Sequence, residues 1–171
     1  MTSNLYNIIE YDDTYYLVPS EEYYAIYGDF IFKQMEANYD CLEYGYDIKI
    51  KPLASLYIYD DNEVSIEQYY NYPRIYSIST GLEIKSHNRH LASILLKSVL
   101  TDIQIKHGNM NVSVDPVVNF NGSTAKNLVK QYMNLSFKID TSKKGFLHLY
   151  STIDDILTNS FVNTLPLISM P

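Results

Sequence analysis

The sequence predicts an α/β fold with a mixed β-sheet in a single domain. In the second half of the chain, two segments carry apolar residues at helical spacing. Short runs rich in β-branched residues and tyrosine lie before, between and after them. The order strand, helix, strand, helix, strand, strand is typical of α/β domains. The 171 residues are enough for one domain with a hydrophobic core, and no repeat or linker divides them.

The first half of the chain gives a less regular pattern. Its first strand is expected at Leu5–Glu10 or at Tyr15–Pro19. Ser20 is typical of a helix cap, because two acidic residues follow it in the first turn. That helical region is expected to run, with a break at Gly28, to about residue 38. Three strands and two turn signals follow: Asp47–Lys51, Ala54–Tyr59, the turn Asp60-Asp61-Asn62, the turn Tyr72-Pro73, and Arg74–Ile84.

The second half gives clearer signals. The predicted elements are a helix over residues 89–106, a strand at Asn111–Val114, a helix at Ala125–Asn134, and strands at Ser136–Asp140 and Phe146–Ser151. Gly108, directly after the last turn of the first helix, is typical of a helix end. Ser123 or Thr124 is the expected cap of the second helix. An apolar tail without a periodic pattern begins at Thr158.

Charge and tyrosine are distributed unevenly along the chain. Residues 1–70 carry 14 acidic and 3 basic side chains, and residues 71–171 carry 6 acidic and 10 basic ones. Sixteen of the 18 tyrosines lie at or before Tyr76. The acidic half would repel phosphates, so nucleic acid is not expected as a direct partner. A cationic partner suits this half of the chain better.

The cellular environment is expected to be cytoplasmic. The single cysteine, Cys41, excludes an internal disulfide, which favours a reducing compartment. The N-terminus lacks the basic flank and apolar core of a signal peptide. No apolar run approaches the roughly 18 residues that would cross a bilayer, so no membrane association is expected. No third ligand accompanies His87 and His90 at a recognisable spacing, so no metal site is predicted.

A polar stretch, Lys85–His90, separates a predicted strand from the helix over residues 89–106. A helix N-terminus presents unpaired N–H groups and a partial positive charge, so such a loop can hold a phosphate. Lys85, Arg89 and the two histidines add positive charge. Phosphate loops usually contain glycine, and none lies between Lys85 and Leu100. From these residues alone, a plain helix start is an equal alternative.

The same stretch resembles the acetyl-CoA loop of the GNAT superfamily of N-acetyltransferases. That loop reads Gln/Arg-x-x-Gly-x-Gly/Ala and continues into a helix with paired leucines. In HNRHLASILL, Ala92 and the pair Leu95-Leu96 match this pattern. His87 stands where the family has Gln or Arg, and His90 where it has its first glycine.

A second stretch resembles another element of the same family. There a strand and an Asn-containing turn lead to a helix that ends in Leu-Tyr-x-x-x-Gly-Phe. The spacing from Tyr132 to Phe137 matches, while Gln131 replaces the leucine and Ser136 replaces the glycine. The resemblance covers about residues 74–151 and rests on the order and separation of its parts.

The resemblance implies a GNAT-like fold, with a central, mixed, mostly antiparallel β-sheet flanked by helices. It divides the single domain over residues 1–171 into three parts. These are a variable acceptor-binding half over 1–73, an acetyl-CoA-binding half over 74–151 and a C-terminal extension over 152–171. Dimers are common in the family, so a homodimer is also an expectation.

The resemblance further implies where acetyl-CoA, the co-substrate, would bind. The backbone of residues 80–82 would pair with the pantetheine arm, and the N–H of Leu82 would polarise the thioester carbonyl. The pyrophosphate would lie on the N–H groups of residues 88–93, helped by Arg89. The implied binding residues are Thr80, Gly81, Leu82, His87, Asn88, Arg89, His90, Leu91, Ala92, Ser93 and Asn121.

Two catalytic roles follow from the resemblance. Tyr132 matches the tyrosine that protonates the departing thiolate in many relatives, although it could equally be a core aromatic residue. The acceptor amine must lose a proton before attack, and Glu83 is a candidate base. Glu63 and Glu67 are alternative bases.

The predicted function is therefore an acetyl-CoA-dependent N-acetyltransferase, in which a primary amine attacks the thioester directly. Carboxylates and aromatic faces attract cations, so the first half suits a polyamine, a lysine side chain or a protein N-terminus as acceptor. The missing loop glycines favour an alternative, a GNAT-fold protein that has lost catalysis and binds CoA or another protein. A tyrosine-rich interaction protein is a third hypothesis.

Overall fold

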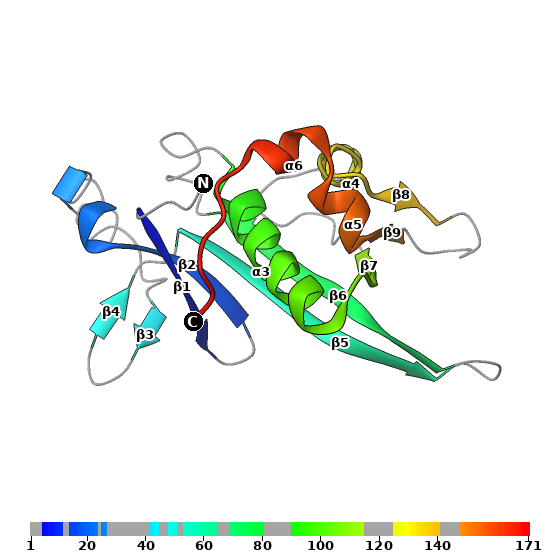
Figure 1. Cartoon of the computed structure of the whole chain (residues 1–171), viewed down its shortest axis with the longest axis horizontal. Coiled ribbons are helices and arrows are strands. Elements are labelled where there is room, and N and C mark those ends of the chain that lie inside the picture. Colours follow the sequence, from blue (N-terminus) through cyan, green and yellow to red (C-terminus); the bar gives the residue numbers. More distant parts are fainter. Residues whose placement is uncertain are drawn as a thin grey trace. The chain divides into compact units, whose positions relative to one another are not determined.

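The computed structural model describes residues 5–11, 14–23, 25–26, 42–44, 48–50, 53–64, 69–80, 90–114, 125–140 and 148–171. The strands are β1 (Tyr6–Tyr11), β2 (Thr14–Pro19), β3 (Leu42–Tyr44), β4 (Ile48–Ile50), β5 (Ala54–Val64), β6 (Tyr69–Thr80), β7 (Asn111–Val114), β8 (Lys138–Ile139) and β9 (Leu149–Thr152) (Figure 1). The helices are α3 (Leu91–His107), α4 (Ala125–Met133), α5 (Ile153–Leu157) and α6 (Ser160–Thr164).

The chain forms two compact units. The first contains Met1–Leu56, Ile78–Val99 and Pro166–Pro171. The second contains Tyr57–Ser77 and Leu100–Leu165. Strands β5 and β6 and helix α3 each contribute residues to both units.

The sheet is mixed, as the sequence predicts. Strand pairs β1–β2, β7–β9 and β8–β9 are antiparallel, whereas β6 and β7 are parallel. Parallel neighbours need a long crossover, and α3 lies in the connection between β6 and β7 (Figure 1). A separate two-stranded antiparallel sheet contains β3 and β4.

In the first unit, both candidates for the first strand form strands, and these pair as the hairpin of β1 and β2. Ile8 lies opposite Leu17 in the register, and both side chains are buried. The sheet continues to β5, where the Leu53 N–H donates to the Leu17 carbonyl at 2.8 Å. The Ser20 hydroxyl accepts from the Tyr23 N–H at 3.2 Å, so the predicted helix cap is confirmed.

Helix α3 agrees with the predicted helix to within two residues at its start and one at its end. Its apolar face is buried through Leu91, Ile94, Leu95, Leu96, Val99 and Leu100. Gly108 has φ 80, and its N–H donates to the Gln104 carbonyl at 2.8 Å. This left-handed residue closes the helix, which confirms the predicted end.

The C-terminal residues of the first unit are held by α3. The hydroxyl of Ser98 donates to the Ile94 carbonyl at 2.9 Å and accepts from the Ile168 N–H at 3.0 Å. Ser98 is 1% exposed and Ile168 is 4% exposed. The tail that has no periodic pattern in the sequence is therefore anchored by a buried hydrogen bond.

In the second unit the strand order is β5-β6-β7-β9-β8. Val112 and Val114 of β7 and Leu149 of β9 supply buried side chains. Helix α5 starts directly after β9, where the Thr152 hydroxyl accepts from the Asp155 N–H at 3.1 Å. The Ile153 N–H also donates to the Met110 carbonyl at 2.9 Å, which fixes α5 to the segment before β7.

The two turns that the sequence predicts at residues 60–62 and 72–73 are both wrong. Strand β5 continues through Asp60-Asp61-Asn62, and β6 continues through Tyr72-Pro73. Pairing along two long neighbouring strands outweighs local turn preference. Pro73 precedes Arg74, the first β6 residue paired with β7, so its missing N–H costs no bond in that ladder.

The strands near the C-terminus are shorter than predicted or shifted. Only Lys138–Ile139 is extended in the predicted strand Ser136–Asp140, because Ser136 belongs to the turn that closes α4. The last strand is Leu149–Thr152 instead of Phe146–Ser151. The sequence pattern also misses α5 and α6, which have five residues each.

Candidate functional site

The N-terminus of α3 has the features of an anion site. The first i→i−4 bond of this helix runs from the Ile94 N–H to the His90 carbonyl at 2.9 Å. The N–H groups of residues 91–93 precede that bond and have no acceptor within the helix. No acidic residue lies in the first turn, so the partial positive charge of the helix end is not neutralised there.

His90, the residue before α3, has the backbone conformation of a glycine. Its φ is 67, in the left-handed region that side chains with a Cβ rarely adopt. Its side chain is exposed. At this position the GNAT loop has its first glycine, and φ 67 is a conformation that glycine adopts without strain.

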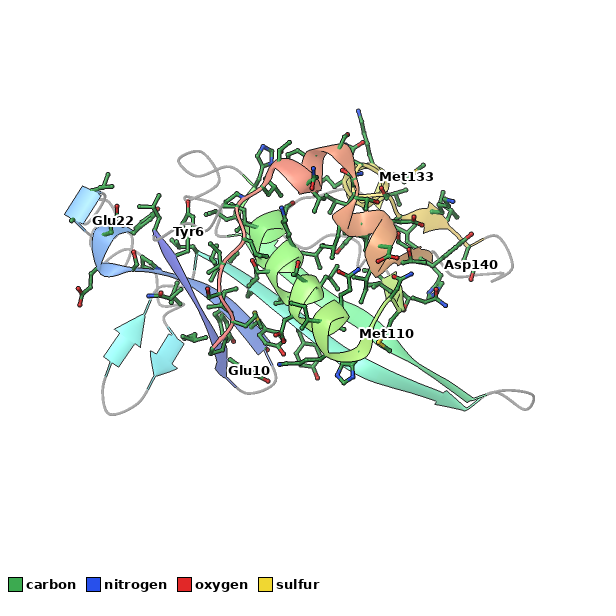
Figure 2. All side chains as sticks on the ribbon, viewed as in Figure 1. Tyr6, Glu10, Glu22, Met110, Met133 and Asp140 are labelled. Atoms are coloured by element: carbon green, nitrogen blue, oxygen red, sulfur yellow. The ribbon has the colours of Figure 1, made fainter. Side chains whose placement is uncertain are left out.

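The C-terminus of α4 is a Schellman motif. The Phe137 N–H donates to the Tyr132 carbonyl at 3.1 Å, and the Ser136 N–H donates to the Met133 carbonyl at 3.1 Å. Ser136 takes the left-handed position of the motif with φ 74. Met133 is the last helical residue (Figure 2). Glycine is the usual residue at the left-handed position, as in the GNAT pattern.

Among the described residues, His90 and Ser136 are the only non-glycine residues with positive φ. They are also the two positions at which the family motifs have glycine and this chain does not. The structure therefore gives a physical reason for both glycines. One precedes the helix of the loop motif, and the other closes the helix of the tyrosine motif.

The Tyr132 side chain is buried, with 9% of its surface exposed. Its ring meets that of Phe137 edge to face, with centroids 5.4 Å apart and an interplanar angle of 76°. Burial raises the pKa of Tyr132 to about 12, because the phenolate would lose its hydration. The phenol is thus protonated at neutral pH and holds its proton more tightly than an ordinary tyrosine with a pKa near 10.

Strand β6 extends beyond its pairing with β7. The parallel register joins Arg74 to Ser113 and Ile75 to Val114, and β6 then continues to Thr80. Beyond Ile75, no described residue of β7 pairs with β6. A strand edge that has no neighbouring strand can pair with an extended chain. Sequence reasoning missed one feature here: the hydroxyl of Ser113 is buried without a hydrogen-bond partner among the described residues.

The other predicted site residues divide into two groups. Thr80 is the last residue of β6, Leu91 is buried at the start of α3, and Ala92 and Ser93 are half-buried in its first turn. Seven lie outside the described residues: Gly81, Leu82, Glu83, His87, Asn88, Arg89 and Asn121. Of the alternative bases, Glu63 lies in β5, and Glu67 is outside the described residues.

In the described part of the chain, no three histidine, cysteine, aspartate or glutamate residues gather in a way that could hold a metal ion. No helix in that part has the length and apolar character needed to cross a membrane.

No protein-family model and no curated protein matches the sequence. Among solved structures, a mutant AtaT toxin bound to the C-terminus of the antitoxin AtaR and acetyl-CoA is similar. The TM-score is 0.52 at 8% identity, over 84% of this chain and 69% of that chain. The KacTA–DNA complex has a TM-score of 0.48 at 12% identity, over 91% of each chain.

The likeness to AtaT concerns the fold. It agrees with the mixed, mostly antiparallel sheet and with the helices that the sequence predicts. The chain therefore has a GNAT-like fold, and this prediction is confirmed.

Proposed function

We propose that this chain is an acetyl-CoA-dependent N-acetyltransferase that acts on a primary amine of a cationic acceptor. The observation that supports the proposal most is the positive φ of His90 and Ser136. An accidental sequence resemblance would give no reason for both glycine positions of the two motifs to take up a glycine conformation. The GNAT-like fold supports the same function.

Acetyl-CoA would bind at β6 and at the start of α3. In this proposal the backbone of residues 80–82 would pair with the pantetheine arm, and the Leu82 N–H would donate to the thioester carbonyl oxygen. The N–H groups of residues 88–93, with Arg89 and His87, would hold the pyrophosphate, and Asn121 would contribute to the same site. The unneutralised helix end fits this anion.

Acetyl-CoA supplies an acetyl group activated as a thioester, and two side chains of this chain would manage the protons. Glu83 accepts a proton from the acceptor ammonium, so that a neutral amine attacks the carbonyl carbon. The carbon–sulfur bond then breaks, the attacking nitrogen gives its second proton to the departing thiolate, and Tyr132 donates a hydrogen bond to that sulfur. Because its pKa of about 12 exceeds the roughly 8.5 of an ordinary thiol, the phenol stabilises the thiolate more readily than it releases its proton.

The acceptor would be a cation that is recognised by the first half of the chain. Glu21 and Glu22 are exposed, and Tyr15 and Tyr16 are half-buried on β2. Carboxylates and tyrosine rings together attract ammonium groups. A polyamine, a lysine side chain and a protein N-terminus share this chemistry. We propose further that the protein is cytoplasmic and forms a homodimer.

One observation favours a second candidate function, a GNAT-fold protein that binds CoA or another protein without catalysis. Burial makes Tyr132 a weaker acid than its ordinary pKa would give. A weaker acid at this position would reduce turnover more than it would reduce the affinity for CoA.

Titration calorimetry with acetyl-CoA, followed by a thiol-release assay, separates the two functions. The amine panel contains spermidine, a lysine peptide blocked at its N-terminus and a lysine-free peptide with a free N-terminus. Binding together with thiol release on one of these amines supports the transferase. Binding without release on the whole panel supports the second candidate. No binding at high micromolar acetyl-CoA overturns the transferase and the CoA-binding form of the second candidate.

A further inference from the structure

The side-chain amide of Asn159, between α5 and α6, joins two helix ends in the second unit. Its Oδ1 accepts from the N–H groups of Phe161 at 3.0 Å and Val162 at 3.2 Å, which caps α6. Its Nδ2 donates to the Asn134 carbonyl at 3.0 Å and to the Ser136 hydroxyl at 2.8 Å. All hydrogen-bonding groups of this amide therefore have a partner, and exchanging its O and N atoms would break the bonds to Phe161, Val162 and Asn134.

The two acceptors of Asn159 belong to the turn that closes α4. Asn134 directly follows the helix, and Ser136 is its left-handed residue with φ 74. The Ser151 hydroxyl holds the same turn from β9, because it donates to the Ser136 carbonyl at 2.9 Å. A serine in the left-handed conformation is less stable than a glycine there by about 1 kcal/mol. The hydrogen bonds from Asn159 and Ser151 help to hold Ser136 in this conformation.

The hydrogen bonds of this turn converge on the backbone carbonyl of Tyr132. Its carbonyl accepts from the Leu135 N–H at 2.9 Å and from the Phe137 N–H at 3.1 Å. Its ring packs against the ring of Phe137. A change in the turn would move the backbone and the ring of Tyr132 together.

From these contacts we infer that Asn159 is a positioning residue for the phenol of Tyr132 in the proposed acetyl transfer. The inference rests on the proposed function. Asn159 lies 27 positions after Tyr132 and outside the stretch that resembles the GNAT motifs. It acts through the closing turn of α4 and has no contact with the reacting atoms. Catalytic groups are sensitive to such placement, since an error of about 1 Å can cost about a hundredfold in rate.

The informative variant is Asn159→Asp. An aspartate keeps the acceptor that caps α6, and its charge is favourable at that N-terminus. Its second oxygen faces the Asn134 carbonyl oxygen instead of donating to it, so the bond to Asn134 is replaced by a repulsion, and only the Ser136 hydroxyl can still bond to this side chain. The control is Thr152→Ala, which removes the cap of α5 and costs a comparable amount of stability.

Steady-state kinetics provide the first measurement. We expect Asn159→Asp to lower kcat about tenfold, with the KM for acetyl-CoA within about twofold of its original value. In the Tyr132→Phe background the same substitution should leave the residual rate unchanged, because the phenol it positions is absent. An equal loss of kcat in both backgrounds would mean a general structural role and would overturn the inference.

Nuclear magnetic resonance of a chain labelled on its tyrosine rings gives a second measurement that needs no activity. The Tyr132 signal is assigned by its loss in Tyr132→Phe. We expect Asn159→Asp to shift that signal and Thr152→Ala to leave it in place. A Tyr132 signal that does not respond to Asn159→Asp overturns the inference. If the original chain has no turnover with any amine, the proposed function fails, and this signal alone decides whether Asn159 positions Tyr132.

Discussion

The rings of Tyr132 and Phe137 meet edge to face, with centroids 5.4 Å apart, across the turn that closes α4. A Schellman motif usually includes an apolar contact between these two positions, and here both partners are aromatic. Tyr132 therefore has a structural role through its ring, whereas the proposed chemistry concerns its hydroxyl alone. Substitutions that keep the ring and remove the hydroxyl separate the two roles.

Tyr132→Phe should lower kcat about a hundredfold, as expected when a hydrogen-bond donor to developing charge is removed, and leave the KM for acetyl-CoA nearly unchanged. The edge-to-face contact persists, so the urea midpoint should not fall. Thiol release under saturating acetyl-CoA measures the effect. Tyr150→Phe is the matched control, since Tyr150 is exposed on β9. An unchanged kcat would remove Tyr132 from the mechanism.

Stability at alkaline pH should also depend on Tyr132. Its folded pKa of about 12 lies above the value near 10 in the unfolded chain, so the unfolded state loses this proton first as the pH rises. The contribution of protonated Tyr132 to the unfolding free energy is complete below pH 10. It is lost between about pH 10 and 12, by about 1.4 kcal/mol per pH unit. The difference in unfolding free energy between the original chain and Tyr132→Phe isolates this dependence from the other tyrosines. A difference that stays constant over this range would contradict the raised pKa.

His90→Gly should be more stable than His90→Ala by about 1 kcal/mol, because only glycine adopts φ 67 without strain. Both variants lose the imidazole, so their difference reports the backbone alone. Calorimetric titration should find an acetyl-CoA affinity for His90→Gly that is no weaker than that of His90→Ala. Equal unfolding free energies would mean that the positive φ carries no strain.

At position 136 we again expect the glycine variant to be more stable than the alanine variant, but for a different reason. Ser136→Gly relieves the strain of φ 74 but loses the bond from Asn159, and each effect is about 1 kcal/mol, so the net change is small. Ser136→Ala keeps the strain and loses the bond, which should cost about 1 kcal/mol. Urea unfolding measures both variants. An alanine variant as stable as the glycine variant would contradict this account.

Ser98→Ala should destabilise the chain by about 1–3 kcal/mol, because the buried Ile168 N–H loses its acceptor. Hydrogen exchange at the Ile168 amide should become faster than in the original chain. Ser160→Ala, at an exposed position, is the control. Unchanged exchange at Ile168 would show that the hydrogen bond does not hold the tail.

The parts of the fold that could be predicted from the sequence have strong local signals. The apolar face of α3 and the glycine after it determine that helix with little help from the rest of the chain. Strand β7 matches its predicted bounds, because Asp115-Pro116 follows it in the sequence and proline cannot continue a central strand. Ser20 is likewise a local signal, since a serine cap acts within three residues.

The missed features depend on contacts between distant segments. Pairing within the sheet extends β5 through Asp60-Asp61-Asn62, although those residues favour a turn. The role of Asn159 requires α4 and α6 to lie together, which no local pattern indicates. The left-handed backbone of His90 and Ser136 was hidden because neither residue type favours it. Comparison with a glycine-containing motif was the one signal that could have indicated it.

The hydrogen bond from Ile168 to Ser98 has a consequence for the order of folding. The bond spans 70 positions, and residues 166–171 belong to the same compact unit as residues 78–99. A ribosome releases Ser98 long before it makes the N–H that pairs with this hydroxyl. The second unit, which ends at Leu165, is complete before these last residues are added. The first unit therefore reaches its native hydrogen bonding only after synthesis of the second has finished.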